Sequence, residues 1–161
     1  MAELTPLDEK LGEVLGLAQA AQDATKKVAK LSADHDELVT RLERMRSEAE
    51  ETERRCQELI DGLEGKKTKI QEKGRETKSE ATEMMGIYLG ADADELDGFE
   101  FLTMAEAGEL GHWQIVHRMS EKVGAGDARE LAEWAIPIQE RHEQLVRQTS
   151  LELAAEEAVA A

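Results

Sequence analysis

The chain has 161 residues, a length typical of one domain, and 40% of them are hydrophobic, which is enough for a core. It carries 36 acidic and 20 basic residues, and the resulting net charge of −16 argues against partners such as nucleic acids or anionic membranes. The single cysteine, Cys56, excludes an internal disulfide and a zinc site built on several thiolates. The N-terminus has no signal-peptide pattern and no apolar run could span a bilayer, so we expect a cytoplasmic protein.

Residues 5–31 form the first of four long segments whose apolar side chains recur alternately every three and four positions, as in packed helices. We expect Thr5 to cap this helix, with Pro6 at its first position. Gly12 and Gly16 lie four positions apart and weaken the helix, and they predict a close approach of another helix.

A second such segment starts between residues 32 and 36, where an aspartate can cap it. Its predicted inward positions are Leu38, Leu42, Met45, Ala49, Thr52, Cys56 and Leu59.

Residues 62–98 break the pattern, because a polar, locally basic stretch is followed by a short apolar piece and an acidic turn. We expect a solvated crossover that holds one or two short helices. Its basic patch could instead contact an anion, and it consists of Lys66, Lys67, Lys69, Lys73, Arg75 and Lys78.

The third and fourth segments cover residues 99–123 and about 128–152, and we expect Asp127 to cap the fourth and residues 154–161 to fray. Their predicted inward positions are Leu102, Ala105, Glu109, His112, Val116, Met119 and Val123, then Leu131, Ala135, Ile138, His142, Leu145 and Thr149. Two antiparallel helix pairs joined by a long crossover predict an all-α fold, a four-helix bundle of ferritin-like topology. Residues 1–153 would form this single domain.

Three strongly polar residues, Glu109, His112 and His142, fall on these otherwise apolar faces. Burial of an isolated charge is costly, so we expect the three to converge near the middle of the bundle. Glu109 and His112 form an E-x-x-H pair, whose spacing places a carboxylate and an imidazole on one helix face. Such ligands suit an iron, manganese or zinc ion.

The rest of a dimetal centre is incomplete, because Gln139 stands three positions before His142, where a glutamate would be needed. The second helix offers Glu48 or Glu53 as a further ligand. The sequence therefore predicts a single-metal or altered site. The alternative is a buried polar network without an ion, which can fix the register of the helices.

Three stretches, residues 49–59, 105–119 and 134–145, resemble helices of a known family. This is the bacterial ferritin-like family of the stress-associated YciE/YciF type. The resemblance implies a ferritin-like fold and a metal site linked to stress. The chain departs from the family's pattern at three candidate ligand positions, namely Glu48, Gln114 and Gln139.

Two functions follow from these observations. The first is a ferritin-like metal-binding protein that handles iron or peroxide, with Glu109, His112, His142 and either Glu48 or Glu53 as ligands. The second is a structural or interaction protein on the same scaffold, acting through a helix face as a homodimer. No Ser/His/Asp or Cys/His constellation and no glycine-rich phosphate loop is present, so the sequence names no catalytic residue.

Overall fold

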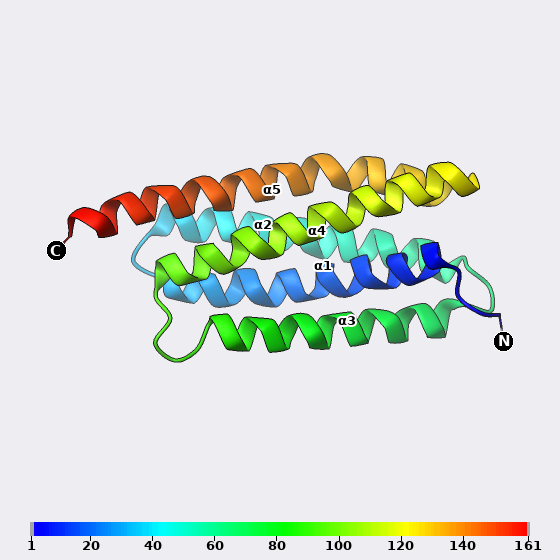
Figure 1. Ribbon diagram of the computed structural model, residues 1–161, viewed down its shortest axis with the longest axis horizontal. Coiled ribbons are helices and arrows are strands. Elements are labelled where there is room, and N and C mark those ends of the chain that lie inside the picture. Colours follow the sequence, from blue (N-terminus) through cyan, green and yellow to red (C-terminus); the bar gives the residue numbers. More distant parts are fainter. Residues whose placement is uncertain (1, 161) are drawn as a thin grey trace.

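The computed structural model describes residues 2–160, and over that range the protein is helical and contains no strand. It has five helices, α1 (Pro6–Leu31), α2 (Asp36–Asp61), α3 (Lys67–Tyr88), α4 (Glu95–Val123) and α5 (Gly126–Val159). Helices α1 and α2 form one antiparallel pair and α4 and α5 form another (Figure 1). Between residues 2 and 160, no helix combines the length and apolar character needed to cross a membrane.

The all-helical class predicted from the sequence is confirmed, but the crossover differs from the prediction. It holds one helix of 22 residues, α3, in place of short helical segments, so a fifth long helix accompanies the predicted four. Helix α3 runs alongside α1 in the same direction (Figure 1). Its buried residues are only Ile70 and Gly74, too few to produce the apolar periodicity that marks the other helices.

The close helix approach predicted at Gly12 and Gly16 is confirmed, and the approaching helix is α3. A Cβ atom on Gly16 would lie 2.3 Å from the carbonyl oxygen of Gly74, and one on Gly12 would lie 2.8 Å from that of Ile70. Real side chains cannot occupy such positions, so glycine is required for the two backbones to touch. As a result, α1 is buried on two sides, by α3 and by the rest of the bundle.

Ion pairs fix the start of α3 to the neighbouring helices. Lys66 Nζ lies 2.8 Å from the carboxylate of Asp8, and Lys67 Nζ lies 2.9 Å from that of Asp61. Asp8 also caps α1 reciprocally with Thr5, as the predicted N-cap requires. Burial raises the pKa of Asp8, but the hydrogen bonds from Lys66 and Thr5 outweigh it and leave the pKa below its usual value. These two lysines of the basic patch are therefore paired within the protein.

The last two helices are joined tightly at Gly124, which ends α4 in the left-handed region with φ of 70°. Helix α5 then starts one residue before Asp127, and the residue preceding the helix, Ala125, makes no side-chain cap. The helix continues unbroken through Pro137 to Val159. Residues 154–159, expected to fray, are helical and exposed in the structure.

The apolar core is divided into two clusters that occupy opposite halves of the bundle. One is centred on Trp113 and the other on Phe99. Between the two clusters, α2 and α5 are predominantly polar, whereas α1 and α4 carry a few polar side chains among small or apolar ones. A polar layer therefore crosses the middle of the bundle, at the level where the sequence placed its candidate ligands.

The α1–α3 crossing can be tested with a pair of alanine substitutions. Gly16→Ala forces the two backbones apart and should lower the free energy of unfolding by about 1–3 kcal/mol. Gly86→Ala is the matched control, since a Cβ atom there meets nothing within 4 Å. It should raise the free energy of unfolding by about 0.5–1 kcal/mol through helix propensity. Chemical denaturation measures both, and equal effects would contradict a tight contact.

Candidate polar site in the bundle core

The polar layer receives side chains from the four helices that surround the core. The term polar layer refers to the following residues. They are Gln19 and Gln22 of α1, Glu48 and Glu53 of α2, Glu106 and Glu109 of α4, and Gln139 and His142 of α5.

His142 lies at the centre of this layer, with a carboxylate facing each of its ring nitrogens. Its Nε2 is 3.0 Å from Glu48 Oε1, and its Nδ1 is 3.7 Å from Glu106 Oε2. The first distance is a hydrogen bond and the second is an ion-pair distance. The imidazole thus joins α5 to both α2 and α4.

This arrangement favours the charged form of His142. Burial alone lowers the pKa of an imidazole, because it disfavours the cation. The carboxylates of Glu106 and Glu48 outweigh burial and raise the pKa of His142 above its ordinary value. Glu48 in turn contacts Arg141 and lies 3.8 Å from Arg44, so positive charge reaches it from the surface as well.

Glu109 lies one helical turn after Glu106 on α4, and its electrostatic environment differs from that of His142. Only 3% of the residue is exposed, and its Oε1 has no hydrogen-bond partner. Burial and the neighbouring charge of Glu106 raise the pKa of Glu109 well above its ordinary value. Glu109 is therefore held in its neutral form at a pH where an exposed glutamate is ionised.

Glu53 completes the polar layer on the α2 side, and Cys56 of the adjoining apolar cluster lies close to it in the sequence of α2. The carboxylate of Glu53 accepts hydrogen bonds from the side-chain amides of Gln19 and Gln22, at 2.9 and 2.8 Å. Cys56 is buried, and burial together with Glu109 and Glu53 raises the pKa of its thiol. A thiol with a raised pKa is unreactive, in agreement with its interpretation as a small core residue.

The structure brings some of the sequence-predicted residues together and separates others. Glu48 and His142 are in contact, and Glu109 is buried in the same layer. Glu53 is occupied by the amides of α1. His112 does not enter the core, since 35% of its side chain is exposed and Nε2 lies 3.5 Å from Glu13.

The displacement of His112 follows from the orientation of α4. Its buried positions include Leu102, Glu106, Glu109, Trp113, Val116 and Ser120. The apolar spacing of the sequence instead predicted that Ala105 and His112 point inward. Trp113 decides between the two faces, because burial of a large apolar side chain contributes about 2–3 kcal/mol. Turning Trp113 inward also turns Glu106 inward.

Glu106 is the residue that sequence reasoning missed, and Gln139 was noted only as a missing ligand. Both are at most 2% exposed, and each has a side-chain oxygen without a hydrogen-bond partner. The available signal was the alternation of four and three from Leu102 through Glu106 and Glu109 to Trp113. That spacing includes Trp113, the largest residue of the helix, whereas the competing spacing through Ala105 and His112 does not.

The polar layer offers donor atoms for a metal ion but not a complete coordination shell. Within residues 2–160, no three histidine, cysteine, aspartate or glutamate side chains converge on one point as metal ligands. The two nitrogens of His142 face separate carboxylates, so a metal ion would have to displace one of them. The arrangement as it stands is a charge-sharing network of carboxylates and an imidazole.

The sequence matches no family model, no curated protein and no solved structure.

The buried groups predict how stability depends on pH. Folded Glu109 keeps a proton that the unfolded chain loses above about pH 4.5, and folded His142 keeps one that the unfolded chain loses above about pH 6.5. In both windows the folded state binds more protons, so the free energy of unfolding falls as pH rises. We expect lower stability at about pH 8 than at about pH 5, measured by urea denaturation.

Glu109→Gln removes one of these two contributions and keeps the shape of the side chain. It should raise the free energy of unfolding at about pH 8 by roughly 1–3 kcal/mol and reduce the pH dependence. A variant that is less stable than the natural chain at this pH would show that an ionised Glu109 is needed.

Proposed function

We propose that this protein is a ferritin-like helical bundle that acts by binding rather than by catalysis, and that a buried carboxylate–imidazole network takes the place of a metal centre. Its action as a homodimer stays a prediction.

The observation that carries the proposal is the double pairing of His142. A metal-ligating histidine presents one nitrogen to the ion and donates from the other to an orienting group. Here Glu48 faces one nitrogen and Glu106 the other, at 3.0 and 3.7 Å. The charge of His142 is thus met by carboxylates of the protein itself, and the network links α2, α4 and α5.

The course of the chain supports the ferritin-like assignment. Helix α2 ends at the same end of the bundle as α1 begins, and α3 carries the chain back along the bundle, so that α4 runs parallel to α2 (Figure 1). Two antiparallel pairs joined by one crossover of bundle length is the connection that ferritin-like folds use. The difference is that the crossover here is itself a long helix packed on α1.

A second candidate function, binding of an iron, manganese or zinc ion, is favoured by a separate observation. Glu106 Oε2, Glu109 Oε1 and Gln139 Oε1 are buried without hydrogen-bond partners. Buried oxygens of this kind are costly unless a proton or a cation satisfies them. In the network proposal a proton held by Glu109 serves this purpose, and in the metal proposal an ion does.

The network can be tested through stability measured in the presence of a chelator. His142→Gln removes a cation from between two carboxylates and should lower the free energy of unfolding by about 3 kcal/mol. His112→Ala is the matched control, because that ring lies at the surface, and it should change stability by no more than about 0.5 kcal/mol. Equal effects would count against a network centred on His142.

Metal content separates the two candidate functions. We expect protein purified without a chelator to contain far less than one metal ion per chain, and His142→Gln and Glu109→Gln to contain the same background amount. About one ion per chain in the natural protein and in His112→Ala, together with its loss from the two core variants, would overturn the network proposal.

A further inference from the structure

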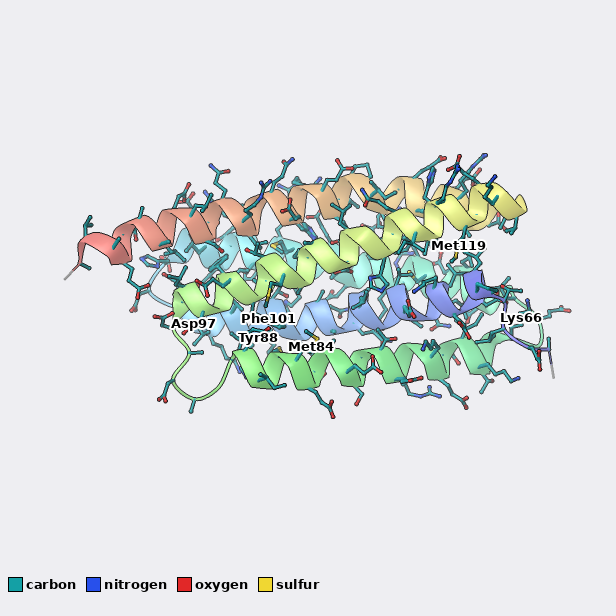
Figure 2. All side chains as sticks on the ribbon, viewed as in Figure 1. Lys66, Met84, Tyr88, Asp97, Phe101 and Met119 are labelled. Carbon is teal, nitrogen blue, oxygen red and sulfur yellow. The ribbon has the colours of Figure 1, made fainter. Side chains whose placement is uncertain are left out.

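A cavity of about 210 Å³ lies between α1, α3 and α4. Glu106, which faces His142, is one of its lining residues. Met84 of α3 and Met104 of α4 line it and are 52% and 47% exposed, so it opens to the surface between these two helices. Figure 2 shows Met84 on the α3 side and Phe101 on the α4 side of this region.

Small side chains create the space in this cavity. Its walls include Ala20, Ala21 and Ala24 of α1, Ala81 of α3, and Ala105 and Gly108 of α4. They come from three helices and occur at the same level of the bundle. Flexible methionines at the opening can adapt to ligands of different shapes. An apolar cavity with a few polar groups at one side is the usual form of a small-molecule site.

The polar side chains of the cavity are two carboxyl groups, one imidazole and the hydroxyl of Thr82, which donates to the carbonyl oxygen of Lys78. Glu106 and Glu109 line it from within the core, and His112 lines it nearer the surface. Glu109 is 97% buried, and its Oε1 has no hydrogen-bond partner among the described residues. Glu109, one of the residues that line the cavity, therefore carries an oxygen that can accept a hydrogen bond and receives none from residues 2–160.

The charge of the protein determines which ligand would fit. The cavity contains no lysine or arginine, whereas two carboxyl groups line it, and the chain as a whole carries a net charge of −16. An anionic head group would be repelled. A cationic donor would be attracted and, by offsetting the charge of Glu106, would favour the ionised form of Glu109, whose proton is then released to the solvent. A cavity of about 150 Å³ admits benzene, so this one has room for an apolar body of roughly six to eight carbon atoms.

We propose that the cavity binds a small amphiphilic amine, with the apolar body between α1, α3 and α4 and the ammonium group donating to the carboxyl group of Glu109. This inference rests on the proposed function, because a metal ion at Glu106 and Glu109 would take the oxygens that the ammonium group needs. It gives the binding protein a ligand class, namely primary amines with a short hydrocarbon chain.

The experiment compares three probes that share one hydrocarbon chain: n-octylamine, 1-octanol and octanoate. Calorimetric titration near neutral pH and at about 0.15 M salt limits non-specific attraction to the acidic surface. We expect octylammonium to bind best and octanoate worst. Glu109→Gln should weaken binding of octylammonium by about tenfold or more and bring its affinity close to that of octanol.

A blocking variant shows whether the probe enters the cavity. Gly108→Leu places a large side chain in the cavity wall, and a Cβ atom at this position meets nothing within 4 Å. Gly126→Leu is the matched control, since it makes the same change in equally open space at the start of α5. Neither substitution alters the net charge, so attraction to the surface stays the same in both.

Loss of octylammonium binding in Gly108→Leu, with unchanged binding in Gly126→Leu, would support the proposal. Equal binding to both variants, or octanoate binding as tightly as octylammonium, would overturn it. Metal content distinguishes a failure of this inference from a failure of the proposed function. If the protein contains no metal and binds none of the three probes, only the cavity proposal is refuted. If it contains about one metal ion per chain, the proposed carboxylate–imidazole network is refuted.

Discussion

The pairing of His142 with two carboxylates is the interaction on which the centre of this bundle depends. A buried imidazolium needs negative charge nearby, and a buried carboxylate needs a cation or a proton. Glu48 from α2 and Glu106 from α4 supply the first, and His142 from α5 supplies the second to both. Because each partner comes from a different helix, satisfaction of these charges fixes the relative register of three helices. Apolar packing above and below the polar layer would tolerate several registers, and the charges would not.

The fifth helix changes the role of the first. In a plain four-helix bundle each helix has an outer face in water, but α3 covers the outer side of α1 through the contact of Gly12 and Gly16 with its backbone. The same covering encloses the cavity, because α3 supplies one of its walls. The helix that the sequence analysis took for a solvated connector thus contributes both to packing and to the candidate ligand site.

The sequence predicted the helical class and the approximate course of four helices because their apolar residues repeat at regular intervals. Helix α4 starts earlier than the expected residue 99, and α5 continues beyond the expected residue 152 to Val159. The same repeat predicted the burial of His142 and Glu109. Helix α3 was missed because a helix that buries Ile70 and Gly74 alone leaves almost no periodic signal. Glu106 was missed because two neighbouring faces of α4 both fit the spacing, and only the packing of Trp113 against the other helices decides between them. Local pattern identifies the helix, and contacts with other helices set its rotation.

The contact between Glu48 and His142 joins residues 94 positions apart in the chain. Closing a loop of that length costs entropy before the contact can contribute any stabilisation, whereas the hairpins of α1 with α2 and of α4 with α5 need only short turns. The two hairpins can therefore assemble early and separately, and the polar layer becomes complete only when they dock. Until that moment Glu48 on the first hairpin lacks its partner His142 on the second, so the last step of folding is also the one that gives this carboxylate its histidine.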